Sequence, residues 1–180
     1  LPKFRTLWLG MFFSLAAMQT ELVARSWLAY DISDSAFMLG LVAMARSIPQ
    51  VALSPIAGVA ADRYDRRNVL LASQSAMMAL ALINAVLVHL GVIEIWHLFA
   101  LGLFQGIAFP FTMPTRTAFM SVLVGKEHMA NALALDSTGR NLNMIGAPAI
   151  AGVLIAWNPV IAFYVIAIFY GLAVLTLVRL

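Results

Sequence analysis

The stretch GVAADRYDRRNVL, residues 58–70, concentrates charge between two long apolar runs. Five of the seven residues at positions 61–67 are charged, whereas only 11% of the 180 residues in the whole chain are Asp, Glu, Lys or Arg. Ionised side chains are costly in the hydrocarbon of a bilayer. The stretch is therefore expected to form an aqueous turn between two membrane-spanning helices, and the rest of the sequence is read outward from it.

The composition favours a membrane protein. Hydrophobic residues make up 63% of the chain and the mean hydropathy is +0.93, whereas soluble domains average about 45–50% apolar residues. The net charge of +3 is not arranged as a basic stripe, which argues against a nucleic-acid partner. The absence of cysteine excludes disulfide scaffolds, thiolate metal sites and cysteine nucleophiles. The lipid bilayer is thus the expected surrounding of an all-α protein.

The number of spans follows from segment length. A helix needs about 20 mostly apolar residues to cross the hydrocarbon core. The basic start of the chain is similar to a signal peptide, but its apolar run continues past a typical h-region, so we interpret it as the first span. The sequence predicts one N-terminal six-helix transmembrane bundle over residues 1–180, with spans near 7–30, 37–61, 68–90, 96–118, 131–156 and 160–178.

Lysine and arginine gather on one side of the predicted bundle. Eight of the 11 lie at the N-terminus, in or beside the second and fourth connections, and at the C-terminus. The other three fall inside spans, and the first, third and fifth connections have none. The positive-inside rule then places both ends of the chain and the charged stretch in the cytoplasm. We expect a multi-pass protein of the inner (plasma) membrane.

The spacing in the charged stretch closely resembles the signature that the major facilitator superfamily carries between its second and third helices. The signature consists of a glycine, an Asp-Arg pair four positions later and then a basic pair, here Gly58, Asp62, Arg63, Arg66 and Arg67. The stretches GIAFPFTMPTRTAFMSVLV and NALALDSTGRNLNMIGAPAIAGVL narrow the resemblance to the branch that includes the enterobactin exporter and macrolide-type drug efflux proteins. The resemblance covers essentially the whole chain.

The resemblance implies a fold and a function. The chain would form one half, a 3+3 inverted repeat, of a twelve-helix fold whose C-terminal half is missing from this sequence. The expected function is proton-coupled efflux of small molecules, drugs or siderophores, by a secondary active antiporter that works by alternating access, as in multidrug resistance. The alternative is a self-contained six-helix channel or a non-transporting membrane protein. Continuation of the reading frame into six more spans would favour the transporter.

No enzyme, cofactor or metal site is expected. The letters VGKEH contain Gly-Lys but lack the rest of a phosphate-binding P-loop. His89, Glu94 and His97 surround the third connection, but their spacing matches no standard zinc pattern. The sequence therefore predicts that a transporter of this kind would draw its energy from an ion gradient rather than from ATP.

The family signature implies a cytoplasmic gate formed by Asp62 and Arg66 with neighbouring helices and with the C-terminal half. Two features depart from the family pattern: Asp65 stands where glycine is common, and the fourth span has no acidic residue to pair with Arg66. Glu127 or Asp136 are the available substitutes. Independently, a carboxylate at the C-terminal end of a helix is disfavoured by the helix dipole and seeks a cation. The alternative is that these basic residues only fix the topology.

Charged residues inside spans are candidate functional groups, because each is costly unless paired or hydrated. Glu21 and Arg25 are four positions apart on one face of the first helix. Glu21 and Arg46 each lie about ten residues, or roughly 15 Å, below the outer end of their helices. We expect one buried cluster near the midplane, with Glu21 as the candidate proton-coupling group. The alternative is a static ion pair between the first two helices.

The fifth span carries a second charged pair, Asp136 and Arg140, and Arg116 is expected at similar depth. The two interpretations are a polar inner vestibule and static packing. Pro148 and Gly152 are candidate helix-bending positions within the small-residue run GAPAIAG. Small residues also permit close helix contact, here and at the Gly102-x-x-x-Gly106 motif of the fourth span.

Overall fold

Helices form almost the whole described chain. The computed structural model describes residues 2–180, except for the side chains of residues 2, 3, 61, 62, 126 and 127. The elements are α1 (Pro2–Ser33), α2 (Ala36–Arg63), α3 (Arg66–His89), α4 (Ile95–Ala108), the 3₁₀ turn η1 (Phe109–Phe111), α5 (Thr112–Trp157) and α6 (Pro159–Val178). The predicted all-α class is confirmed.

Three turns owe their positions to capping side chains. Ser35 accepts a hydrogen bond from the Met38 amide at the start of α2. Asp65 accepts one of 3.0 Å from the Asn68 amide at the start of α3, and Asn158 caps α6 in the same way. Each cap satisfies an amide that has no partner within its own helix. Asp65 has φ −59°, so this turn does not need the glycine that the family often has there.

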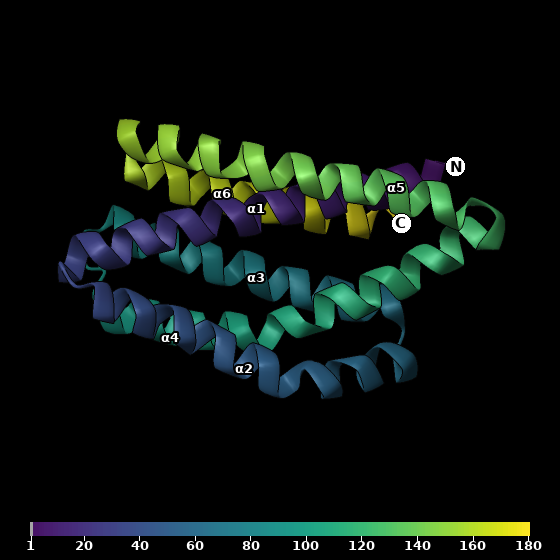
Figure 1. Ribbon diagram of the computed structural model, residues 1–180, viewed down its shortest axis with the longest axis horizontal. Coiled ribbons are helices and arrows are strands. Elements are labelled where there is room, and N and C mark those ends of the chain that lie inside the picture. The colour runs from purple at the N-terminus through teal and green to yellow at the C-terminus, as the bar shows by residue number, and fades with distance from the viewer. Residues whose placement is uncertain (1) are drawn as a thin grey trace.

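The connection predicted over VGKEHM is much shorter in the structure. Helix continues through the whole of α5 except at Gly125, which has φ 68° and ψ 176°. Glycine adopts this backbone region without strain, so one residue reverses the chain direction. The fourth span therefore extends from Ile95 through η1 to Gly125, and the polar residues after Gly125 begin the next helix. In Figure 1 the green ribbon turns back on itself at this point.

Among the described residues, five helical segments are long and apolar enough to cross a membrane: Phe4–Ser33, Ala36–Ala60, Arg66–His89, Ile95–Gly125 and Pro159–Val178. The segment from residue 126 to 157 is helical, but its charged and amide side chains lower its hydropathy. Figure 1 shows both termini at the end of the molecule where the chain reverses in α5 and where α2 turns into α3. The segments thus run alternately up and down.

The core lies around α6, which packs against both α1 and α3. Phe163, Ile166 and Tyr170 of α6 are almost fully buried, together with Met77 of α3. A smaller apolar cluster, including Leu7, closes the end that carries the termini. In contrast, α2 and the second half of α5 expose large apolar side chains, for example Phe37, Met44, Ile48, Val51, Ile145, Val153 and Trp157.

The glycines of the fourth span make a close helix contact. A Cβ atom on Gly106 would collide with the carbonyl oxygen of Arg46, and one on Gly102 would lie 3.6 Å from the Cβ of Ala45. The backbones of α4 and α2 therefore approach closely here. Gly146 and Gly152 have no neighbouring atom within 4 Å of a Cβ position, so no such contact is made there within the described part. α5 continues through Pro148 as helix.

Candidate functional site

A buried carboxylate joins three helices in the middle of the bundle. Glu21 of α1 is 1% exposed. Gln105 of α4 donates a hydrogen bond from Nε2 to its Oε1, and the Tyr170 hydroxyl of α6 donates to its Oε2 at 3.2 Å. Nη2 of Arg25 lies 3.7 Å from Oε1. Both oxygens of the carboxylate are therefore engaged, and the charge is opposed by one cation from the next turn of the same helix.

The guanidinium of Arg25 is buried without hydrogen-bond partners. The residue is 6% exposed, and its Nε, Nη1 and Nη2 atoms have no acceptor within the described residues. The contact with Glu21, at 3.7 Å, is an ion pair that is too long for a hydrogen bond. The guanidinium lies close to Gly102 of α4, where a Cβ atom would be in van der Waals contact with Nη1 at 3.5 Å. Arg25 thus retains unused donors in a low-dielectric environment, which is an energetically unfavourable arrangement.

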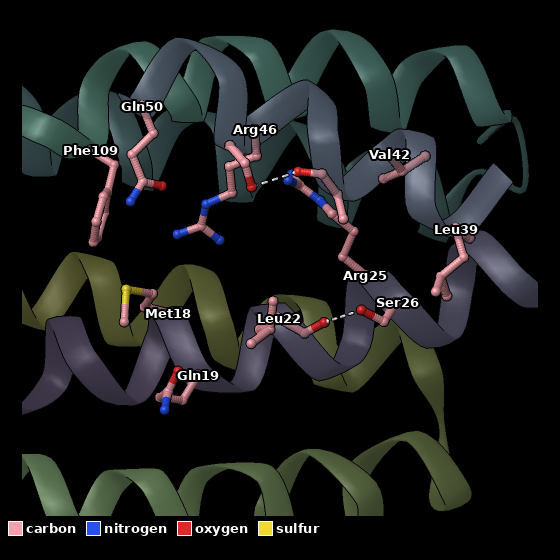
Figure 2. A pocket seen from close by; sticks show the side chains of 13 residues that line it. Met18, Gln19, Leu22, Arg25, Ser26, Leu39, Val42, Arg46, Gln50 and Phe109 are labelled. Atoms are coloured by element: carbon pink, nitrogen blue, oxygen red, sulfur yellow. Dashed lines mark hydrogen bonds between the residues drawn. The ribbon is translucent and has the colours of Figure 1, made fainter. Parts of the chain in front are cut away.

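Arg46 of α2 is a second arginine that, like Arg25, lines the gap between α1 and α2. Its Cζ lies 5.3 Å from the centroid of the Phe109 ring, within the range of a cation–π interaction. Figure 2 shows Arg25 extending from α1 and Arg46 from α2 into the gap between the two helices, with Gln50 and Phe109 beside Arg46. The gap is a cavity of about 280 Å³. No Asp or Glu lines it among the described residues.

A second charged cluster joins the two limbs of α5. Oδ1 of Asp136 lies 2.6 Å from Nη2 of Arg116, and its Oδ2 lies 2.8 Å from Nη2 of Arg140. Asp136 and Arg116 are buried, whereas the Arg140 side chain is 40% exposed. Nearby, Asn143 donates to the Phe12 carbonyl oxygen at 3.3 Å, which fastens the second limb to α1. Both carboxylate oxygens of Asp136 are therefore engaged in ion pairs.

The family-signature residues lie at the end of the bundle that carries the termini. Arg67 donates to the carbonyl oxygens of Leu177 at 3.2 Å and Val178 at 2.8 Å, so it caps the C-terminal end of α6. Arg66 lines a hollow with Phe119 and Val122. It makes no ion pair with any side chain that the structure describes.

The remaining signature positions contribute less defined contacts. Arg63 is exposed, and a Cβ on Gly58 would meet no atom within 4 Å. The side chains of Asp62 and Glu127 lie outside the described residues. Of the two proposed substitutes for a partner of Arg66, Asp136 is therefore placed with Arg116 and Arg140 instead.

The sequence pattern does not single out two residues of the central site, Gln105 and Tyr170. Gln105 lies between two packing glycines, and Tyr170 lies in α6, the most apolar of the spans. The available signal was polarity itself, because an amide or hydroxyl within a span commonly bonds across helices. Across the part of the chain that the structure describes, no three His, Cys, Asp or Glu side chains are grouped as metal ligands would be. The central site therefore offers ion pairing and hydrogen bonding.

Comparison with known proteins places these features in a family. The family described as transmembrane secretion effector matches residues 2–180. The chain is 28% identical over 166 residues, 87% of its length, to YfiS of Bacillus subtilis, an MFS-type transporter, and covers 37% of that protein. It is 22% identical to macrolide efflux protein A of Streptococcus pyogenes over 99% of its length, covering 45% of the relative.

A third relative is the enterobactin exporter EntS of Shigella flexneri. It is 29% identical over 87% of the chain, which covers 40% of the relative. The chain therefore spans less than half the length of each of these three proteins.

Proposed function

The chain belongs to the major facilitator superfamily of transporters, and we propose that the protein exports small molecules as a secondary active transporter. The observation that carries this proposal is the buried Glu21–Arg25 pair beside a cavity between two membrane-spanning helices. Ionisable groups inside spans are unfavourable and are retained where they serve transport. Two relatives are named as exporters, one of macrolides and one of enterobactin, so drugs and siderophores are the substrate classes to examine first.

We propose that six crossings form the N-terminal half of a twelve-helix fold with a 3+3 inverted repeat. The segment from residue 126 to 157 would be the fifth crossing. Two of its polar side chains, Asp136 and Asn143, are buried and bonded to protein partners, which lowers the cost of a crossing. The common end of the two termini in Figure 1 agrees with an even number of crossings. The expected partner of this bundle is a C-terminal half of the same transporter.

The orientation is proposed from charge. The end of the bundle that carries the termini also carries Arg63, Arg66 and Arg67. The positive-inside rule assigns that end to the cytoplasm. The protein would accordingly lie in the plasma membrane, the inner one where there are two, with both ends of the chain in the cytoplasm.

We propose that Glu21 carries the coupling proton. Its neighbours from α1, α4 and α6 are Arg25, Gln105 and Tyr170, and Arg46 of α2 lines the cavity together with Arg25. Protonation would remove the charge that opposes Arg25 and would leave two cations beside the cavity. That change would alter the electrostatic balance between α1 and α2, the kind of difference on which alternating access depends. The competing interpretation is a static ion pair.

We propose that Asp62 and Arg66, with Gly58, Arg63 and Arg67 around them, form the cytoplasmic gate. Support comes from the hollow that Arg66 lines with Phe119 and Val122 at the end of the fourth span. Arg116, Asp136 and Arg140 would form the inner vestibule above the gate. Pro148 and Gly152 would allow the same helix to bend during the transport cycle. A self-contained channel is not favoured, because the relatives are transporters.

The test is efflux from cells that lack their own exporters. Cells expressing the full-length protein are loaded with a macrolide or with enterobactin, and its loss is followed with and without a protonophore. Protonophore-sensitive efflux supports the proposal. Efflux that persists after the proton gradient collapses would show that the coupling is wrong, and retention of every compound at the level of empty-vector cells would show that the export function is wrong.

A further inference from the structure

Gln105 of α4 bonds one end of its amide to Glu21 and leaves the other end without a partner. Its Nε2 donates to Oε1 of Glu21, whereas its own Oε1 is buried and has no hydrogen-bond donor among the described residues. The residue is 0% exposed, so bulk water does not supply that donor. Buried polar atoms without partners are uncommon in native structures and call for an explanation. A second hydrogen-bonding state, in which this oxygen is used, is such an explanation.

An amide reverses the direction of its hydrogen bond when it turns over. Rotation about the last side-chain bond exchanges the NH₂ donor for the C=O acceptor, and the two ends are nearly equal in size. The bond to Glu21 is the one that holds the Gln105 amide within the described part of the chain, so the rotation breaks no other. The helix backbone can stay in place, because Gly106 packs α4 against the carbonyl oxygen of Arg46. Gln105 can therefore face Glu21 as a donor or as an acceptor.

These two orientations match the two protonation states of Glu21. The ionised carboxylate only accepts, and it now takes one donor on each oxygen, from Gln105 and from Tyr170. A protonated carboxyl has one O–H donor and keeps an acceptor oxygen. With a proton from water on Oε1, Glu21 donates to the turned amide of Gln105, while Oε2 continues to accept from the Tyr170 hydroxyl. Both oxygens of Glu21 are thus hydrogen-bonded in either state.

The charged groups near Glu21 leave this exchange open. Nη2 of Arg25 lies 3.7 Å from Oε1, too far for a hydrogen bond, so protonation breaks no bond to it and removes only its counter-charge. Arg46 of α2 lines the cavity together with Arg25 and makes no ion pair with Glu21 among the described side chains. The protonated state is therefore opposed by charge and not by lost hydrogen bonds.

Asp136, the second carboxylate that is buried among the described residues, has no neighbour of this kind. Its two oxygens are bonded by Arg116 and Arg140, and these pairs hold the charged groups of α5 apart from Glu21. A guanidinium has donors only, so a proton on Asp136 would face a donor, and no rotation of an arginine supplies an acceptor. The surroundings of Asp136 fit the ionised form alone, whereas those of Glu21 fit both forms.

We propose that Gln105 is a positioning residue for the coupling proton: its amide donates to ionised Glu21 and turns over to accept from protonated Glu21, which places the proton on Oε1. This inference rests on the proposed function in one respect, since Glu21 is taken to be the group that binds the proton. The reversal of the amide does not itself require that transport occurs.

The test is infrared difference spectroscopy of the purified full-length protein in detergent, with carbon-13 in the glutamine side-chain carbonyls, as the pH is lowered in steps. Protonation of Glu21 should produce a carboxyl C=O band. At the same pH the labelled carbonyl of Gln105 should shift to lower frequency, because a free C=O gains a hydrogen bond. Glu21→Gln should lose both signals. Gln105→Leu should lose the labelled shift and move the Glu21 carboxyl band to higher frequency, because the O–H has lost its acceptor.

Gln74→Leu is the matched control. It replaces another buried glutamine, in α3, whose side chain is not bonded to Glu21, and both signals should stay as in the wild type. Where Gln105→Leu does not unfold cooperatively on heating, the labelled wild type and Glu21→Gln decide the question. A labelled band that does not move, a shift that persists in Gln105→Leu, or no Glu21 carboxyl band at any pH at which the protein is folded would each overturn the proposal.

The two proposals fail in different ways. A Gln105 shift that follows Glu21 protonation, in a protein that exports no tested compound, would leave the amide reversal in place and remove the transport function. Protonophore-sensitive export that depends on Glu21, with an unmoved Gln105 carbonyl, would leave the transport function in place and remove the amide reversal.

Discussion

Asp136 lies 2.6 Å from Arg116 across the chain reversal at Gly125, and both side chains are buried. The ion pair joins the end of the fourth span to the start of the following helix. Asp136 also holds Arg140 at 2.8 Å from the next turn of its own helix. One carboxylate therefore neutralises two cations, and its loss leaves Arg116 buried without a counter-charge.

Replacing Asp136 with Asn should destabilise the protein strongly. An uncompensated buried charge typically costs about 3–5 kcal/mol. Thermal unfolding of the detergent-purified protein measures the change. Arg140→Gln is the matched control: it removes the exposed side of the same cluster, where ion pairs contribute about 1 kcal/mol or less. Equal stability losses in the two variants would contradict a dominant Asp136–Arg116 pair.

Glu21→Gln should abolish the response of efflux to a proton gradient. The amide can still accept a hydrogen bond from Tyr170, but it cannot exchange a proton or carry a charge. Uptake of substrate into everted membrane vesicles, with and without an imposed pH difference, measures the coupling. Tyr170→Phe is the control, since it removes one hydrogen bond and keeps the carboxylate. Unchanged gradient dependence in Glu21→Gln would leave the Glu21–Arg25 pair a static ion pair.

Gly106→Ala should destabilise the bundle and Gly152→Ala should not. A methyl group at position 106 would overlap the carbonyl oxygen of Arg46, and because backbone cannot rotate aside, α2 and α4 must separate. Overpacking of this kind typically costs about 1–3 kcal/mol. No atom lies within 4 Å of the corresponding point at Gly152, where alanine is expected to gain up to about 1 kcal/mol of helix propensity. Thermal unfolding of the two variants is compared.

Arg67→Gln should loosen the C-terminal end of α6. The variant loses the guanidinium bonds to Leu177 and Val178 and a positive charge placed favourably at a helix C-terminus. Charge-assisted bonds of this kind contribute about 1.5–3 kcal/mol. Hydrogen exchange of the amides in the last turn of α6 should become faster. Arg63→Gln, at an exposed position of the same turn, should leave that exchange unaltered, and a matching acceleration there would argue against a specific cap.

Asp62→Asn and Arg66→Ala should each slow transport without lowering the thermal unfolding temperature. The gate is proposed to act through its partners in one state of the transport cycle, so its loss changes the balance between states rather than the fold. Initial efflux rates of the two variants are compared with wild type at equal expression. If both variants transport at the wild-type rate, the gate proposal is wrong and the basic residues only fix the topology.

The turn at residues 61–67 was predicted correctly because the interactions that form it are local in the sequence. Charge excludes residues 61–67 from hydrocarbon, and Asp65 provides the capping oxygen within three residues of the amide that it serves. The helix limits and the alternation of spans follow from the same short-range rules. The prediction of the fourth connection was wrong because its polar residues were taken to indicate a loop. A single glycine with positive φ makes the reversal, and the polar residues after it are helical.

The central site was only partly predictable. Glu21 and Arg25 are four positions apart on one helix, so their proximity follows from the helical repeat. Gln105 and Tyr170 reach Glu21 from 84 and 149 positions away, and nothing in a linear pattern chooses them over other polar residues in spans. Their selection depends on how α1, α4 and α6 pack, which is decided by side-chain shape in three dimensions.

The long reach of these bonds has a consequence for biogenesis. When α1 leaves the ribosome and enters the bilayer, neither Gln105 nor Tyr170 has yet been synthesised. Glu21 must then enter the hydrocarbon with Arg25 as its companion from the same helix, one turn away. The pair gives the newly inserted helix no net charge at this depth, which reduces the insertion penalty that a lone carboxylate would impose. The Glu21–Arg25 contact, at 3.7 Å too long for a good hydrogen bond in the folded bundle, is thus the interaction that neutralises the carboxylate until Gln105 and Tyr170 have been synthesised.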